Sequence, residues 1–150
     1  MTIALGSDHG GFKLKESIKA HLTEQGYEIK DFGTYNEDSV DYPTFALKAA
    51  LSVSKGECEK GILVCSTGIG ISIAANKVRG IRAALCGDLL SAKLTREHND
   101  TNVLALGSFV TGEKLAHAIV DTWLGTPFSN ESRHQRRIDL VTEIENQYLK

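Results

Sequence analysis

The stretch GILVCSTGIGISIAANK, residues Gly61–Lys77, decides how the rest of the chain is interpreted. It begins with an apolar run, Ile62–Val64, that is typical of a buried strand and that ends in a thiol at Cys65. Small residues follow from Ser66 to Gly70, and a helix is predicted over Ile71–Asn76. Glycines allow backbone N–H groups to turn toward a ligand, and a helix N-terminus favours negative charge. The stretch therefore predicts an anion-stabilising site that favours Cys65 as a thiolate.

Apolar runs and helical patterns alternate on both sides of this stretch, and Gly26 and Pro43 mark two of the boundaries. This alternation indicates a parallel sheet covered by helices on both faces, a three-layer α/β/α sandwich with an additional C-terminal helix. Five strands are expected, at Thr2–Leu5, Tyr27–Phe32, Gly61–Cys65, Ile81–Cys86 and Asn102–Leu106. Helices are expected at Gly11–Gln25, Pro43–Ser54, Ile71–Asn76, Asp88–Glu97, Gly112–Trp123 and Arg136–Leu149.

Size and charge restrict the class of protein. The 150 residues suit one domain, residues 1–150, and the 41% hydrophobic and 24% charged fractions are ordinary for a globular protein. A net charge of −2 gives no strong field for nucleic acid or an acidic membrane surface. No apolar run approaches the roughly 18 residues of a membrane-spanning helix. We expect the N-terminal segment to be the first strand and not a secretory signal, because Asp8 follows too soon.

Three cysteines, Cys58, Cys65 and Cys86, occur without a CxxC pair, which argues against a disulfide framework and a zinc site. They indicate a reducing, cytoplasmic compartment and no bound metal. A free cysteine at a strand end is usually a small buried hydrophobe. The loop of small residues after Cys65 favours a functional thiol there. Cys58, between two glutamates, is expected at the surface, and Cys86 is expected to pack in the core.

The loop Gly68–Ile69–Gly70 also suggests a dinucleotide site. It starts a GxGxxG-like pattern, but Ile73 stands where the third glycine should be, although Asp88 could serve as the ribose-binding acid. The loop follows the third strand and no second half of such a fold is present, so a nicotinamide site is the weaker hypothesis. A P-loop is excluded because no Lys–Ser/Thr pair follows the glycines.

Other reactive side chains gather at predicted element ends. Asp8 and His9 leave the first strand, and at the carboxyl edge of a parallel sheet they would lie near Cys65. An N-capping aspartate beside a solvent-exposed histidine is the plain alternative. His98 and Asn99 precede the fifth strand, which places them at the opposite edge. They are either helix-end capping residues or contributions to a site across a subunit interface.

The only basic cluster lies near the C-terminus. Arg133 and Arg137 are four residues apart and share one helical face. A solvated helix face is the common meaning of such a pattern. Guanidinium geometry also suits a phosphate clamp, which would explain a basic cluster in a slightly acidic chain.

Together these motifs resemble the type B ribose-5-phosphate isomerases, in the family that also holds galactose-6-phosphate and allose-6-phosphate isomerases. The resemblance runs nearly end to end and implies a Rossmann-like fold. It rests on several long segments: GSDHGGF (Gly6–Phe12), DFGTY (Asp31–Tyr35), DYP (Asp41–Pro43), CSTGIGISIAANK (Cys65–Lys77), GIRAAL (Gly80–Leu85), HNDTNVLALG (His98–Gly107) and RHQRR (Arg133–Arg137).

The resemblance implies an aldose–ketose isomerase without metal or cofactor, a homodimer or dimer of dimers whose active sites lie at the subunit interface. Cys65 would be the base that moves a proton between the first two sugar carbons. Asp8 and His98 would open the furanose ring, with His98 from the partner subunit, and Thr67 would shuttle protons between oxygens. The substrate-binding positions implied are Asp8, His9, Ser66, Gly68, Ile69, Gly70, Asn99, Arg133 and Arg137.

The chain departs from the family pattern at two positions. Ser66 stands where glycine usually follows the cysteine, and Phe109 stands where arginine is often found after the fifth strand. The pair His98–Asn99 favours ribose 5-phosphate and ribulose 5-phosphate as substrates. A hexose 6-phosphate such as allose 6-phosphate is the enzymatic alternative, and a nucleotide-binding regulatory module is the alternative from another class.

Overall fold

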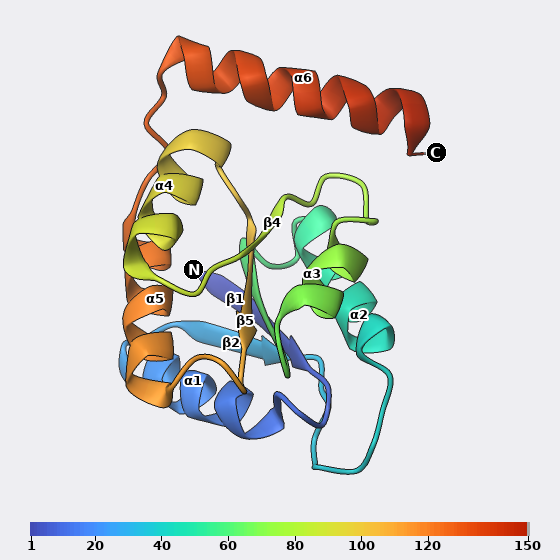
Figure 1. Cartoon of the computed structure of the whole chain (residues 1–150), viewed down its shortest axis with the longest axis vertical. Helices are drawn as coiled ribbons and strands as arrows, with labels where there is room; N and C mark the ends of the chain where they lie inside the picture. The colour runs from blue at the N-terminus through green and yellow to red at the C-terminus, as the bar shows by residue number, and fades with distance from the viewer. Residues whose placement is uncertain (150) are drawn as a thin grey trace.

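The computed structural model describes residues 1–149, in which a five-stranded parallel sheet lies between two layers of helices (Figure 1). The strand order across the sheet is β2-β1-β3-β5-β4, and each neighbouring pair is parallel. The predicted sheet is therefore confirmed, with β3 at its centre. The strands are β1 (Thr2–Ser7), β2 (Glu28–Asp31), β3 (Lys60–Cys65), β4 (Ala83–Leu85) and β5 (Val103–Gly107).

Two apolar cores fill the space on either side of the sheet. Helices α1 (Phe12–Glu24), α4 (Leu89–Asn99) and α5 (Glu113–Gly125) cover one face around the fully buried Trp123. Helices α2 (Tyr42–Ser54) and α3 (Ile69–Ala75) cover the other. Burial on both faces explains why β1, β3 and β5 are almost continuously apolar rather than alternating. The predicted three-layer sandwich is confirmed.

The last helix, α6 (Ser132–Tyr148), does not cover the sheet but runs across one end of the molecule (Figure 1). Only His134 and Ile138 of α6 are buried. Its far end is tied to the α3–β4 loop, where the Arg79 guanidinium donates to the Leu149 carbonyl oxygen at 2.7 Å and the Gly80 N–H donates to Glu145 Oε1 at 2.8 Å. Helix α6 is thus held near its start by His134 and Ile138 and at its far end by the α3–β4 loop.

Three expectations need correction. Helix α3 begins at Ile69 and not at Ile71, because Gly68 adopts φ +80° and caps it directly. Helix α6 begins at Ser132 and not at Arg136, so its first turn includes Arg133. Cys58 is not at the surface: it is 1% exposed.

The burial of Cys58 has a local cause. Its N–H donates to the Ser52 carbonyl at the end of α2 at 3.1 Å, which turns the thiol into the core, while the neighbouring Glu57 and Glu59 face solvent. Cys86 is buried, as expected. Among residues 1–149, no helix has the length and apolar character needed to cross a membrane.

Candidate active site

The exits of β1, β3 and β5 are joined at the carboxyl edge of the sheet. The Ser108 N–H, just after β5, donates to the Cys65 carbonyl at 2.9 Å, and the Ser108 hydroxyl donates to the Gly10 carbonyl at 2.6 Å. Gly11 packs so closely on β3 that a Cβ there would lie 2.3 Å from the Val64 carbonyl oxygen. These contacts hold the three exits in one rigid group, as the topology predicts.

Cys65 ends β3 and is buried, with 5% of the residue exposed. The Gly68 N–H donates to its sulfur at 3.1 Å. This bond places the partial positive charge of an amide N–H beside the sulfur, the atom that would carry out nucleophilic or basic chemistry. Gly68 can make this bond because it has φ +80°, and a Cβ at this position would lie 2.5 Å from Leu85 Cδ1.

The loop after Cys65 uses part of its hydrogen-bonding capacity internally. Besides the Gly68 N–H on sulfur, the Ile69 N–H donates to Thr67 Oγ1 at 3.2 Å. The Thr67 side chain is exposed, and its hydroxyl proton stays available as a donor. Of the residues predicted to surround an oxyanion, Ser66 and Gly70 therefore remain the better candidates for direct N–H donation.

Asp8 and His9 occupy the exit of β1, beside the Cys65 loop. The Asp8 carboxylate is buried, and its Oδ1 accepts the Gly11 N–H at 3.0 Å, so this side chain also holds the turn before α1. A Cβ at Gly10 would lie 2.4 Å from the Ser66 hydroxyl, which shows how closely the first and third exits approach. His9 Nδ1 accepts the Val40 N–H at 3.1 Å.

Tyr42 is a part of this edge that the sequence did not single out. A Cβ at Gly70 would lie 2.6 Å from the Tyr42 ring, so the first residue of α2 rests against the start of α3. The sequence signal that could have identified Tyr42 was its position directly before Pro43, at a predicted helix start.

A second cluster lies at the other end of the molecule, beneath α6. His98 and Asn99 are in the last turn of α4, and together with Arg137 they line a cavity of about 850 Å³ between α6, β4 and the end of α3. The His98 and His134 rings are in contact, with centroids 4.2 Å apart and planes tilted by 38°. Cys65 does not line this cavity.

His134 was also missed by the sequence analysis, which gave it no role of its own. It lies on the buried side of α6, and its Nδ1 is 2.8 Å from the Ser129 hydroxyl. Burial, and then the positive charge of the neighbouring His98, lower the pKa of His134 below its usual value. A neutral imidazole is therefore favoured beside His98.

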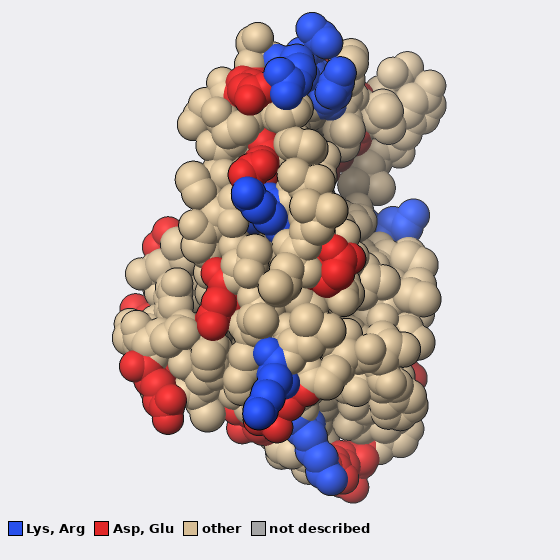
Figure 2. All heavy atoms as spheres, turned by 60° about the vertical axis from the view of Figure 1, so that its left-hand side comes forward, with Lys and Arg blue, Asp and Glu red and all other residues tan. Residues whose placement is uncertain are grey.

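The basic cluster covers the start of α6. Figure 2 shows Lys and Arg side chains concentrated at the top of the molecule, where the first turns of α6 place Arg133, Arg136 and Arg137. Arg133 is paired with Glu131 and exposed, whereas Arg137 lines the cavity. Guanidinium groups beside His98 and Asn99 suit a phosphate ester with hydroxyl groups.

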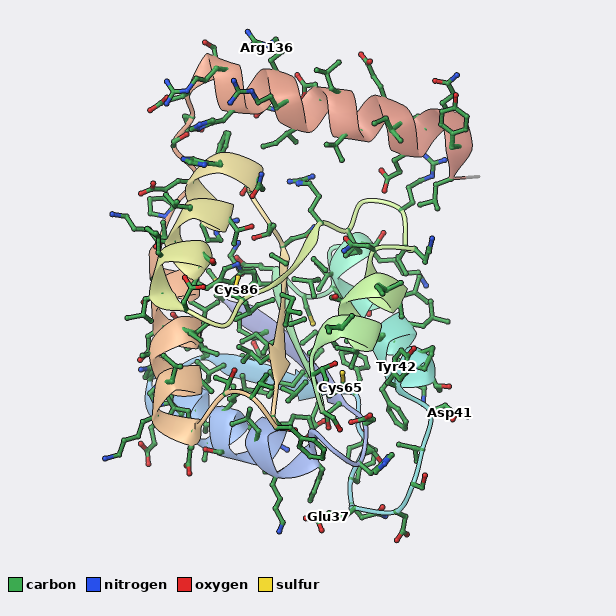
Figure 3. All side chains as sticks on the ribbon, viewed as in Figure 1. Glu37, Asp41, Tyr42, Cys65, Cys86 and Arg136 are labelled. Atoms are coloured by element: carbon green, nitrogen blue, oxygen red, sulfur yellow. The ribbon has the colours of Figure 1, made fainter. Side chains whose placement is uncertain are left out.

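Within one chain the predicted site is thus divided between two places. Asp8, His9, Cys65 and the loop through Gly70 form the first, and His98, Asn99 and the arginines form the second (Figures 1 and 3). In residues 1–149, no group of three or more His, Cys, Asp or Glu side chains is arranged to hold a metal ion.

Comparison with known proteins identifies the family. The family model described as Ribose/Galactose Isomerase matches residues 3–141. Ribose-5-phosphate isomerase B of Escherichia coli (strain K12) is 54% identical over 143 residues, 95% of each chain. The Clostridium thermocellum ribose-5-phosphate isomerase B structure has a TM-score of 0.97 at 55% identity over 99% of each chain. The Mycoplasma genitalium ribose-5-phosphate isomerase B structure with bound ribulose-5-phosphate has a TM-score of 0.93 at 40% identity over 97% of each chain.

The parallel sheet order, the thiol at the end of β3 and the similarity along nearly the whole chain all indicate the same family. The chain belongs to the ribose/galactose isomerase family.

Proposed function

We propose that this chain interconverts D-ribose 5-phosphate and D-ribulose 5-phosphate, a reaction of pentose phosphate metabolism in the cytoplasm. The observation that carries the proposal is the Cys65 thiol, buried at the carboxyl edge of the sheet with the Gly68 N–H on its sulfur at 3.1 Å. Such a group can act as a base beside a bound sugar. The relative that carries ribulose-5-phosphate in its structure supports this choice of substrate.

The first chemical step is opening of the furanose ring. One group removes the proton of the anomeric hydroxyl while another protonates the ring oxygen, so that the ring C–O bond breaks and an aldehyde forms. Asp8 and His98 take these roles in the proposal. The tilted His134 ring beside it and the end of α4 hold the His98 imidazole in position.

The second step moves a proton along the open chain. The Cys65 thiolate removes the proton from C2 of the aldehyde, and the resulting electron pair forms the C1–C2 double bond of an enediolate. The resulting thiol returns the proton to C1, while Thr67 exchanges protons between O1 and O2. General acid–base help of this kind gives about 10²–10⁴-fold in rate. Backbone N–H groups near Ser66 and Gly70 stabilise the enediolate oxygen.

The remaining groups orient the substrate. His9, Arg133 and Arg137 bind the phosphate, and Asn99 binds a sugar hydroxyl. Fixing the phosphate determines which carbon faces Cys65. No cofactor or metal enters this scheme.

A complete site needs a second copy of the chain, because the two groups of residues lie apart in one chain. We propose a homodimer, alone or paired into a dimer of dimers, in which the His98 side of one protomer faces the Cys65 side of its partner. Large apolar side chains are exposed near both places: Ile69 and Ile73 on α3, and Val141, Ile144 and Tyr148 on α6. A two-fold interface of this kind forms two equivalent sites.

A panel of substrates tests the proposal. Turnover should be greatest with ribose 5-phosphate and much lower with allose 6-phosphate. A higher kcat/KM for allose 6-phosphate would favour the hexose 6-phosphate alternative. Calorimetric binding of a dinucleotide, with no turnover of either sugar phosphate, would favour the nucleotide-binding alternative and reject the isomerase.

A further inference from the structure

The loop between β2 and α2, residues 32–41, is fixed to the exit of β1 by paired backbone bonds. The Ser7 N–H donates to the Gly33 carbonyl at 2.7 Å, and the Thr34 N–H donates back to the Ser7 carbonyl at 2.8 Å. Ser7 precedes His9 by two residues. The start of the loop and the backbone that carries His9 therefore form one unit.

A buried ion pair stabilises the start of this loop at the end of β2. Lys15 of α1 is fully buried, and its Nζ lies 2.7 and 2.6 Å from the two carboxylate oxygens of Asp31 at the end of β2. Asp31 Oδ1 also accepts the Gly33 N–H at 2.9 Å. The loop thus leaves the sheet from a point with little freedom to move.

The other end of the loop returns to His9. The Val40 N–H donates to His9 Nδ1 at 3.1 Å. A backbone amide can only donate, so the ring nitrogen that accepts from it carries no proton. In a neutral imidazole the single proton must then lie on Nε2, and the free ring nitrogen is a donor.

We propose that Val40 is a positioning residue whose amide holds His9 in the Nε2–H tautomer, so that the ring presents a donor to the phosphate of the substrate. This inference rests on the proposed function, in which His9 binds that phosphate. Phosphate oxygens accept hydrogen bonds, and the opposite tautomer would face them with a lone pair. The loop would therefore contribute to phosphate affinity through the backbone N–H of Val40, and no loop side chain needs to contact the phosphate.

The tautomer can be measured in the free enzyme, independently of catalysis. Nitrogen-15 NMR of histidine-labelled protein at mildly alkaline pH distinguishes a protonated from an unprotonated ring nitrogen. For His9 we expect an unprotonated Nδ1 and a protonated Nε2 in the wild type. Val40→Ala, which keeps the amide, should show the same signals. Val40→Pro, which removes the N–H, should give a mixture of tautomers. A protonated Nδ1 in the wild type would overturn the proposal, and this readout needs no variant that folds.

The binding consequence is a KM effect. Val40→Pro should raise the KM for ribose 5-phosphate about three- to tenfold, with kcat within about twofold, because part of one charge-assisted hydrogen bond is lost. An unchanged KM in a variant with mixed tautomers would overturn the link to phosphate. If the wild type shows no isomerase activity, the proposed function is rejected, but the proposal for Val40 can still be tested. Inorganic phosphate is then the probe: a weaker response of the His9 signals in Val40→Pro than in Val40→Ala would support the link, and an equal response would reject it.

Discussion

The two halves of the site differ in how they are built. Around Cys65, backbone hydrogen bonds and close-packed glycines from three strand exits fix each group, and the thiol and Asp8 are buried. Around His98, the groups lie at the rim of a cavity under α6, a helix held mainly at its two ends. The comparison indicates that the Cys65 half is preorganised within one protomer, whereas the groups of the His98 half lie beside open space.

The largest effect should come from the rigid half. Cys65→Ala removes the proposed base and should lower kcat by about 10²–10⁴-fold with little change in KM. Cys86→Ala is the matched control, because burial, and then the nearby Asp88 charge, raise the pKa of Cys86 to about 11 and leave it a neutral thiol. The control should keep its kcat and lose about 1 kcal/mol of unfolding free energy. Equal kcat values in the two variants would show that Cys65 is not the base that transfers the proton.

The proposed division between subunits can be tested by mixing two inactive proteins. Cys65→Ala and His98→Asn protomers, unfolded and refolded together, should recover about a quarter of wild-type activity. Half of the dimers would be mixed, and one of the two sites in each would contain both groups. Subunit exchange is verified by mass spectrometry of tagged chains. If exchange is complete and activity stays at the level of the single variants, both groups act within one chain.

The rigid half should also depend on the Lys15–Asp31 ion pair. Lys15→Met leaves the more exposed Lys19 as the cationic partner of the Asp31 carboxylate and should cost about 3–5 kcal/mol of unfolding free energy in urea titrations. Lys19→Met is the control: its side chain is 41% exposed, so about 0–1 kcal/mol is expected. Comparable losses in both variants would mean that the buried contact has no special weight.

The same pair predicts a pH dependence. Burial alone would raise the pKa of Asp31, but the hydrogen bonds from Lys15 and the Gly33 N–H outweigh it and lower the pKa below the usual carboxyl value. A lowered carboxyl pKa stabilises the fold above about pH 4, and this contribution is lost as the pH falls further.

In the other half, Arg137→Ala should weaken phosphate binding. The KM for ribose 5-phosphate should rise about 10- to 100-fold and kcat should change less, because a guanidinium–phosphate contact contributes to binding throughout the reaction. Arg136→Ala is the control, since Figure 3 shows Arg136 on the outer side of α6, away from the cavity that Arg137 lines. A similar KM rise in both would indicate a general effect of positive charge on α6.

Much of the fold followed from local pattern. Four of the five strands were mainly apolar runs between turn residues, and the sheet was predicted because helices separate the strands. The exception is β2, where Glu28, Lys30 and Asp31 are charged. The Cys65 loop was also predictable, since strand, thiol and glycines are contiguous. Cys58 was placed wrongly because its burial depends on the end of α2, and its charged neighbours suggested the surface.

The missing parts of the site depend on contacts between distant residues. Val40 meets His9 through a backbone amide, which leaves no mark in the sequence. The contact between the His98 and His134 rings joins α4 to α6 across a loop whose path the sequence does not specify. In the proposed dimer His98 meets Cys65 of a second chain, and no local sequence pattern encodes that contact.

The smallest expected effect concerns the contact between His98 and His134. The lowered pKa of His134 means that the folded protein binds a proton there less readily than the unfolded chain does. Its contribution to stability is therefore complete at alkaline pH and is lost as the pH falls below about 6.5. His134→Phe keeps a ring on His98 without a titrating group, and acidification should lower its Tm by about 1–3 °C less than that of the wild type. Equal acid sensitivity in His134→Phe and the wild type would assign the loss of stability to other groups and leave the α6 contact insensitive to pH.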